Sequence, residues 1–454
     1  MSIKRQFFGT DGVRAVANCS PMTPEFVLRL AQAAAEVLAA DAGSQERPLC
    51  VIGRDTRASG EMFEAALVAG LNAVGVDVAL AGVVPTPAVA LLCQREGAAM
   101  GVVISASHNP YTDNGIKFLR GNGRKLSDAM EAQIEAMALA ELPLQRRALG
   151  RAIGRVRRLQ GAAQVYIEHA VASMRGVRLD GMAVLLDNAN GAAGVASAMA
   201  LEQLGATVRC FHDRPDGYNI NEDCGCTHPE VIESLMKTRG AEVGLAHDGD
   251  ADRLVLCDES GSSLDGDELM AIAADFMLRE GSLNQRTLAV TVMSNFGLDA
   301  MVRQLGGEVV RTSVGDRYVL QEMHRLGLNL GGEQSGHIVF GDWCTTGDGL
   351  VSALQVLRIV RLTGKSLSQL RGCMRLFPQV KRDLRVLRKP EFETLPSLMQ
   401  CVKTAEQELA GLGRVLLRYS GTEPIVRVLL EGPDAGQLEQ HADAIMAELS
   451  AHLT

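Results

Sequence analysis

Short apolar runs alternate with amphipathic stretches over the first part of the chain. Residues 49–55, 76–82 and 98–105 have the β-branched and glycine-rich character of buried strands, and helical patterns separate them. Strands that alternate with helices in this way are typical of βαβ units. The pattern therefore predicts an α/β fold built on mixed or parallel sheets.

The same alternation returns twice and then stops. A second set of strands and helices begins near Tyr166, and a third begins near Asp265. From about Leu376 the pattern changes to two alternating apolar runs that flank a polar loop, which favours a smaller α+β unit. We expect four domains, which span residues 1–157, 158–257, 258–374 and 375–454. The basic stretch 145–161 is interpreted as a solvated connecting segment.

The amino-acid composition and net charge limit the classes of protein to which the chain can belong. With 454 residues, 47% apolar content and 4% aromatic content, the chain is long enough for several packed domains. A net charge of −9 gives no support for a nucleic-acid or membrane-surface partner. Ten scattered cysteines and a polar N-terminus without a signal-peptide pattern favour a cytoplasmic protein. The apolar run 78–93 contains two prolines, so it is not expected to span a membrane.

Residues 101–118 place two hydroxyl groups and an imidazole at the end of a predicted buried strand. The strand runs into Ser105, Ser107 and His108, and Pro110 prevents a helix from continuing through this point. Loops at the carboxyl ends of strands in α/β sheets commonly carry chemistry. We expect an exposed loop here, and the residues alone leave open whether it is functional or an ordinary turn. Lys117, on the next strand, is a candidate acid, base or anion contact.

Three carboxylates follow a predicted strand at alternate positions. Asp248, Asp250 and Asp252 form a dense cluster that suits a hard divalent cation. The spacing resembles the start of an EF-hand, but Arg253 stands where that loop needs glycine and the flanks are strands, so an EF-hand is rejected. The three aspartates need a further ligand, such as a phosphate oxygen.

Two other segments combine polar groups with glycine, one in a predicted loop at 418–424 and one within a predicted strand at 328–340. The sequence RYSGTEP at 418–424, followed by Arg427, has the hydroxyls, turn glycine and guanidinium groups of an anion-binding loop. The sequence GGEQSGH at 331–337 offers a carboxylate, an amide, a hydroxyl and an imidazole, a set that suits sugar hydroxyls. Arg14, after a glycine-rich turn, is a candidate anion contact.

Some familiar motifs are absent or incomplete. The TGKS at 363–366 lacks the upstream glycine of a P-loop, and no serine lies in a G-x-S-x-G elbow. Cysteines and histidines gather at Cys210, His212, Cys224, Cys226 and His228, but their spacing matches no common zinc module. A zinc site is therefore not predicted.

The four motifs SASHNP, DGDADR, GGEQSGH and RYSGTEP, in this order, resemble the α-D-phosphohexomutase superfamily along essentially the whole chain. The resemblance implies four domains around a central active-site cleft and a phosphorylated Ser107. It implies one Mg²⁺ per chain, held by a phosphoserine oxygen of Ser107 and by Asp248, Asp250 and Asp252. It implies these further site residues: Arg14, Lys117, His108 and His337 at the reaction centre, Glu333 and Ser335 on the sugar, and Arg418, Ser420, Gly421, Thr422 and Arg427 on the non-reacting phosphate.

Details of the motifs favour the branch of the superfamily that acts on glucosamine phosphates. These details are FGTDGVR near the start, Ser105 in the serine loop and TTGDGL at 345–350. The implied reaction interconverts glucosamine 6-phosphate and glucosamine 1-phosphate through a 1,6-bisphosphate, which also acts as an activator. The product would feed UDP-N-acetylglucosamine and cell-wall precursors, and a homodimer is compatible with the resemblance.

Three alternatives remain at this point. A phosphomannomutase/phosphoglucomutase would use the same chemistry on other sugars. A Mg²⁺-dependent phosphatase would release free phosphate, and a non-catalytic binding protein would keep the fold without turnover.

Overall fold

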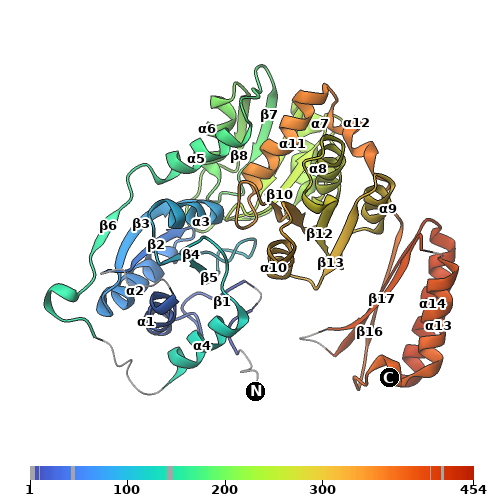
Figure 1. The fold of residues 1–454 in the computed structure, drawn as a ribbon, viewed down its shortest axis with the longest axis horizontal. Helices are drawn as coiled ribbons and strands as arrows, with labels where there is room; N and C mark the ends of the chain where they lie inside the picture. Colours follow the sequence, from blue (N-terminus) through green and yellow to red (C-terminus); the bar gives the residue numbers. More distant parts are fainter. Residues whose placement is uncertain (1–5, 10, 42–46, 141–146, 410, 421–423) are drawn as a thin grey trace. The chain divides into compact units, whose positions relative to one another are not determined.

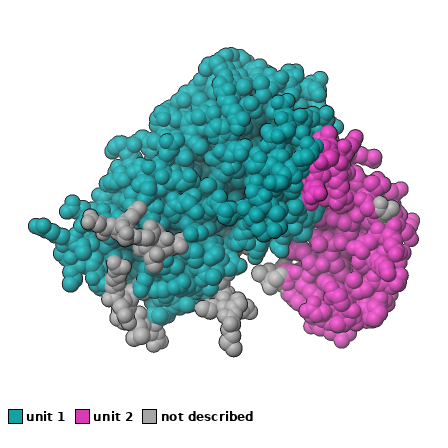
Figure 2. All heavy atoms as spheres, viewed as in Figure 1, with its two compact units in different colours: residues 1–293, 310–372 teal, residues 294–309, 373–454 magenta. Residues whose placement is uncertain are grey.

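The computed structural model describes residues 6–9, 11–41, 47–140, 147–409, 411–420 and 424–454, which fall into two compact units (Figures 1 and 2). Unit 1 consists of Met1–Met293 and Val310–Gly372, and unit 2 consists of Ser294–Val309 and Cys373–Thr454. Together the described residues form four sheets, and the predicted α/β class with mixed sheets is confirmed.

The first sheet of unit 1 has six strands in the order β1-β5-β4-β2-β3-β6. Strands β2, β3, β4 and β6 are parallel, whereas β5 is antiparallel to both β4 and β1. The strands are β1 (Val13–Val16), β2 (Leu49–Arg54), β3 (Asp77–Val83), β4 (Met100–Ile104), β5 (Asp113–Arg120) and β6 (Val156–Arg158). The helices are α1 (Pro24–Asp41), α2 (Gly60–Ala73), α3 (Thr86–Arg95) and α4 (Asp128–Leu139).

Local sequence signals set the helix starts in this part. Thr23 precedes α1 and its Oγ1 accepts a hydrogen bond from the amide of Phe26 at 3.4 Å. Ser127 precedes α4 and its Oγ accepts one from Met130 at 3.3 Å. Such N-caps satisfy amides that have no partner within the helix.

The core of the first sheet follows from strand alternation. Cys50 and Ile52 on β2 belong to the apolar cluster that also contains Phe63 and Leu67 of α2. Alternate strand residues point to opposite faces, so one face of β2 is left to pack against α3. The sheet is therefore buried on both faces, as parallel α/β sheets are.

The basic stretch before residue 162 is more than the connecting segment that the sequence indicated. Its residues Val156–Arg158 form β6, which pairs in parallel with β3 at the edge of the first sheet. All three residues are exposed, so no alternation of apolar and polar side chains marks this strand. Backbone pairing with Val78, Ala79 and Leu80 is what defines it.

Two further sheets lie in unit 1, except for residues 308 and 309, which belong to unit 2. The second has the order β11-β10-β9-β7-β8 and the third has the order β13-β12-β14-β15. The second comprises β7 (Ala183–Asp187), β8 (Thr207–Phe211), β9 (Val243–His247), β10 (Leu254–Cys257) and β11 (Ser263–Leu264), with α5 (Ala162–Ser173), α6 (Gly194–Gln203) and α7 (Pro229–Arg239). The third comprises β12 (Thr287–Thr291), β13 (Glu308–Thr312), β14 (Leu330–Gly332) and β15 (Ile338–Phe340), with α8 (Gly266–Glu280), α10 (Asp316–Leu326), α11 (Gly349–Thr363) and α12 (Leu367–Leu370).

The segment 328–340, interpreted from sequence as one strand with a polar cluster, is a hairpin. Strands β14 and β15 pair antiparallel, and Gly332 lies opposite Ile338. The polar residues 333–337 form the turn between them. The turn therefore projects from the end of the third sheet instead of lying within a strand.

Unit 2 is a three-stranded antiparallel sheet in the order β16-β18-β17, with helices packed on it (Figure 1). Its elements are β16 (Gln379–Arg385), β17 (Arg414–Tyr419), β18 (Ile425–Glu431), α9 (Phe296–Gln304), α13 (Pro396–Glu408) and α14 (Ala435–Leu453). Val428 and Leu430 of β18 pack with Leu438 and Ile445 of α14 in a core of their own. Its C-terminal part, from Cys373 onward, is the smaller α+β unit that the sequence predicts, whereas residues 294–309 with α9 were not expected in this unit.

Candidate active site

The serine loop follows β4, and its first residues, Ser105 to Ser107, are buried, whereas residues 110–112 are exposed as the sequence suggested. The side chains of Ser105 and Ser107 have almost no accessible surface. The Oγ of Ser105 donates to Asp55 Oδ2 at 2.6 Å and accepts from the amide of Ser107 at 2.9 Å. Ser107 itself has φ of +53°, an uncommon backbone for a residue with a side chain. A loop that holds such a residue needs strong support from its surroundings.

Arg57 supplies much of that support. It is fully buried, and its Nε donates to Asp55 Oδ2 at 2.9 Å. Its guanidinium donates to four carbonyl oxygens of the loop, those of Ser107, Asn109, Pro110 and Asp113. From the loop between β8 and α7, Asn221 Nδ2 donates to the carbonyl oxygen of Ser107 at 2.8 Å. The loop backbone is thus fixed from two directions.

The three predicted metal ligands converge in the turn between β9 and β10. One oxygen from each of Asp248, Asp250 and Asp252 lies within 4.8 Å of the others, and all three residues are buried. The Oγ of Ser107 donates to Asp248 Oδ2 at 2.5 Å. The two loops approach closely because Gly249 has no side chain: a Cβ there would lie 2.8 Å from the carbonyl oxygen of Ser107.

The charge of this cluster is only partly compensated by the protein. Burial, followed by the carboxylates of Asp252 and Asp250, raises the pKa of Asp248 to about 8. The Oδ1 atoms of Asp250 and Asp252 are buried and have no hydrogen-bond partner. Buried carboxylate oxygens normally have partners. The donor set is all oxygen, so the residues fit a hard divalent cation such as Mg²⁺.

Lys117 and Arg14 line the same centre as cations. The Nζ of Lys117 lies 2.7 Å from both Asp250 Oδ2 and Asp11 Oδ2, and 3.5 Å from Asp252 Oδ2. Burial by itself would lower the pKa of Lys117, but the three carboxylates outweigh burial and raise it. Arg14 pairs with Asp11 and donates to the carbonyl oxygen of Ala106 at 3.3 Å.

The two predicted histidines lie in different surroundings. His108 Nδ1 lies 3.3 Å from Ser107 Oγ, and burial followed by the charge of Arg253 lowers its pKa to about 4. His337 is buried with its Nε2 3.1 Å from Asp316 Oδ2. Burial would lower the pKa of His337, but Asp316 outweighs burial and raises it to about 9.

A cavity of about 420 Å³ joins these groups. Arg14, Ser107, His108 and Asp252 lie along it, and Glu333, Ser335 and His337 of the β14–β15 turn complete the wall. The structure therefore brings together the predicted serine, metal and sugar residues of unit 1. Glu333 Oε1 accepts a hydrogen bond from the amide of Gly315 at 3.1 Å.

The predicted phosphate residues belong to unit 2. Arg418 and Arg427 face each other across β17 and β18, and the amide of Ser420 donates to Ile425 at 2.8 Å. Two guanidinium groups on neighbouring strands provide forked donors for an anion. Gly421 and Thr422 lie outside the described residues.

Sequence reasoning missed several charged groups of the site. Arg253 and Asp316 line the cavity, and Lys125 pairs with both Asp316 and Asp11. Arg253 directly follows the aspartate motif and Asp11 lies within the first glycine turn, so both were available as signals. Lys125 and Asp316 come from segments far apart in the chain, and nothing in their local sequence marks them.

Comparison with known proteins identifies relatives over almost the whole chain. Family models described as phosphoglucomutase/phosphomannomutase alpha/beta/alpha domains I, II and III match residues 5–144, 164–261 and 265–377, and the C-terminal domain model matches 380–448. A phosphoglucosamine mutase from Syntrophotalea carbinolica is 47% identical over 99% of this chain and 98% of that protein. One from Moorella thermoacetica is 49% identical over 96% of this chain and 97% of that protein.

Solved structures share the fold at lower identity. A phosphoglucomutase/phosphomannomutase family protein from Burkholderia thailandensis has a TM-score of 0.80 at 24% identity, covering 98% of this chain and 97% of that one. An Aspergillus fumigatus N-acetylphosphoglucosamine mutase, in complex with GlcNAc-6P and magnesium, has a TM-score of 0.67 at 17% identity, covering 99% and 96%. No helix among the described residues is long and apolar enough to cross a membrane.

Proposed function

The chain belongs to the phosphoglucomutase/phosphomannomutase family, and we propose that it interconverts glucosamine 6-phosphate and glucosamine 1-phosphate. The choice of substrate is supported by the relatives named phosphoglucosamine mutase, which match nearly the full chain. This favours the aminosugar over the alternative of a phosphomannomutase/phosphoglucomutase with the same chemistry.

The observation that carries the proposal is the position of Ser107. Its Oγ lies 2.5 Å from a carboxylate of the aspartate cluster and opens onto the cavity of about 420 Å³. A hydroxyl held beside three carboxylates would be poorly placed as a nucleophile without a cation to offset their charge. The same hydroxyl, carrying a phosphoryl group, would add the oxygen ligand that the aspartates lack.

Asp248, Asp250, Asp252 and phosphorylated Ser107 are the residues that would hold Mg²⁺. A bound Mg²⁺ would neutralise negative charge on the transferring phosphoryl group. Arg14 and Lys117 would add fixed positive charge at the same place. Since Lys117 Nζ already donates to carboxylates of Asp11 and Asp250, we assign it a charge-stabilising role and not that of a base.

The transfer proposed here balances as a substitution at phosphorus. The bond from phosphorus to Ser107 Oγ breaks as a bond forms to O1 of glucosamine 6-phosphate. The proton of that hydroxyl leaves the sugar, and the serine oxygen takes one up. His108, 3.3 Å from Ser107 Oγ, is positioned to move this proton. The bisphosphate then returns its O6 phosphoryl group to Ser107, which leaves glucosamine 1-phosphate.

The remaining residues complete the proposal. Glu333 and Ser335 would bind sugar hydroxyls, and His337 would contact the reaction centre. The non-reacting phosphate would be bound by Arg418, Ser420, Gly421, Thr422 and Arg427.

The proposal divides the loops among four domains. Domains 1–157, 158–257, 258–374 and 375–454 would carry the serine, metal, sugar and phosphate loops, in that order. A 1,6-bisphosphate would act as activator, and sedimentation analysis tests whether the chain forms a homodimer.

Replacing Ser107 with alanine tests the central step. The variant should lose turnover of glucosamine 6-phosphate, and intact-mass measurement should no longer detect the increase of about 80 Da that a phosphoserine adds. Ser105→Ala is the matched control, because it leaves the Ser107 hydroxyl in place and should keep the mass increase. Full activity in Ser107→Ala would overturn the scheme.

Assays on the wild-type chain separate the alternative functions. Release of free phosphate in proportion to the substrate consumed would indicate a phosphatase. Faster turnover of mannose 1-phosphate would favour a phosphomannomutase/phosphoglucomutase.

A further inference from the structure

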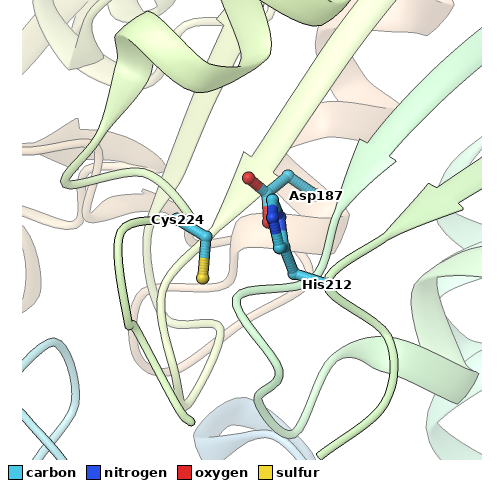
Figure 3. A group of neighbouring side chains, drawn as sticks. All are labelled: Asp187, His212 and Cys224. Carbon is cyan, nitrogen blue, oxygen red and sulfur yellow. The ribbon is translucent and has the colours of Figure 1, made fainter.

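A second cluster of metal-ligating side chains lies in unit 1, outside the carboxylate site. It consists of Asp187 at the end of β7, His212 just after β8 and Cys224 in the loop before α7 (Figure 3). One ligand atom from each lies within 4.8 Å of the others. Three separate segments therefore deliver a carboxylate, an imidazole and a thiol to one point.

The contacts within this cluster leave donor atoms available. His212 Nδ1 lies 3.0 Å from Asp187 Oδ1, but the nitrogen is buried and makes no hydrogen bond of acceptable geometry. The carboxylate of Asp187 is fixed by the backbone, since Oδ1 accepts from Ala189 and Oδ2 accepts from Gly225, each at 3.0 Å. A ligand oriented by such outer contacts needs little rearrangement to bind a cation.

The donor chemistry differs from that of the aspartate cluster. Thiolate, imidazole and carboxylate together suit a borderline divalent cation, whereas Mg²⁺ takes oxygen ligands. We propose that Asp187, His212 and Cys224 bind one Zn²⁺ or a similar cation, with water as a further ligand. The His212 side chain is 33% exposed, which gives solvent access to that position.

Binding would remove the thiol proton of Cys224 to solvent, because the thiolate is the ligand form. A free cysteine thiol is ordinarily protonated at neutral pH, so one proton should be released for each cation bound.

The neighbouring cysteine and histidine do not join this cluster. Cys226 packs in an apolar cluster with Leu185 and Ile232. His228 Nδ1 pairs with Glu230 on the surface at 3.0 Å. The proposed site therefore takes only His212 and Cys224 from the cysteines and histidines that gather in this part of the sequence, where the spacing alone predicted no zinc site. The ligand that completes the proposed site is Asp187, which the spacing does not reveal.

The proposed site is connected to the serine loop through one residue. The amide of Asn221 donates to the carbonyl oxygen of Ala189, two residues beyond Asp187, at 2.9 Å. Its Nδ2 donates to the carbonyl oxygen of Ser107 at 2.8 Å. A cation would cross-link the ends of β7 and β8 to the loop that carries Asn221, so it should raise the melting temperature of the protein.

The test uses Co²⁺ as an optical probe on the full chain, freed of metal and then supplied with excess Mg²⁺ to occupy the carboxylate cluster. We expect one Co²⁺ per chain with a thiolate-to-cobalt charge-transfer band, displaced by Zn²⁺. Cys224→Ser should abolish the band, and His212→Asn should weaken binding by on the order of 10–100-fold. Cys210→Ser, a change two residues before His212, is the matched control and should keep the band.

Two results would overturn the proposal. One is the absence of a thiolate band in the wild-type chain. The other is a band of unchanged strength in both Cys224→Ser and His212→Asn, which would place the ion at other cysteines. If Cys224→Ser does not fold, His212→Asn decides the matter alone, because the ring is one-third exposed and is not part of the core.

Discussion

At the scale of the residue, Arg57 shows how a buried charge positions a reactive group. Its guanidinium has no access to solvent and donates hydrogen bonds to Asp55 and to carbonyl oxygens of the serine loop. Burying a cation is costly unless it is paired and hydrogen-bonded, and here both conditions hold. The same contacts hold Ser107 at its positive φ.

Arg57→Lys should therefore damage turnover more than substrate binding. Lysine cannot reach both the carboxylate and several carbonyl oxygens, so the serine loop should relax and kcat should fall by on the order of 100-fold. KM should change little, because Arg57 does not line the cavity. Arg54→Lys is the matched control, since Arg54 pairs with Glu61 near the surface at 2.9 Å. Equal kcat values for the two variants would contradict the positioning role.

His337 gives a prediction for pH dependence. Burial alone would lower its pKa, but Asp316 raises it to about 9 from 6.5. A group whose pKa is raised by folding stabilises the native state below its unfolded pKa, and that stability is lost as pH rises through the folded value. The contribution should therefore be complete below about pH 6.5 and disappear by about pH 10.

The comparison of wild type with His337→Gln isolates this effect. Glutamine keeps a neutral donor toward Asp316 but does not titrate. The advantage of the wild type in free energy of unfolding should shrink by on the order of 2 kcal/mol between about pH 6 and pH 10. Denaturant titrations at both pH values measure it. A constant difference across this range would show that folding does not raise the pKa of the imidazole.

At the scale of the element, helix α8 supports the sugar loop by its first turn. Asp265 Oδ1 accepts from the amides of Asp267 and Glu268, and its Oδ2 accepts from Gln334 Nε2 at 3.0 Å. The amide of Gly266 donates to the carbonyl oxygen of Gln334 at 3.0 Å. The helix start and the β14–β15 turn are thus one hydrogen-bonded structure.

Asp265→Ala should destabilise both the start of α8 and the β14–β15 turn. Loss of the cap should cost about 1–2 kcal/mol of stability, and the freed Gln334 should raise KM for glucosamine 6-phosphate. Asp434→Ala removes a similar cap from α14, where Asp434 Oδ1 accepts from Gln437 at 3.1 Å, and serves as the control. It should lower stability without changing KM. If both variants leave KM unchanged, α8 does not position the sugar loop.

Helices and strands were predictable where burial imposes a periodic pattern of apolar residues on the sequence. The residues of β2 and β4 are mostly apolar because helices cover these strands. Helices α1 and α4 begin at recognisable N-cap residues. β6 was not predictable, since an exposed edge strand needs no apolar side chain and is defined only by pairing with β3. The β14–β15 turn was misplaced because glycines at 331 and 332 conceal where the strand ends.

At the scale of the whole molecule, the site was predictable only where its residues are close in sequence. Asp248, Asp250 and Asp252 lie in one turn, so their spacing alone predicts a cation site. Arg57 reaches the serine loop from the segment between β2 and α2, and Asp187 meets Cys224 only after three segments fold together. Such contacts depend on topology, and no local pattern encodes them.

The division into two units gives a prediction for metal removal. Unit 2 has its own apolar core, and the proposed metal ligands all belong to unit 1. A ligand that binds only the folded form of one unit stabilises that unit by about 2.7 kcal/mol at 100 times its dissociation constant. Mg²⁺ added to metal-free protein should therefore raise the temperature of the calorimetric transition of unit 1 and leave that of unit 2 unchanged. Hydrogen exchange would assign each transition to its unit.

The control variant is Asp252→Asn, which alters a carboxylate whose Oδ1 has no hydrogen-bond partner. It should remove the shift. Equal movement of both transitions would mean that the units unfold together or that the ion binds elsewhere.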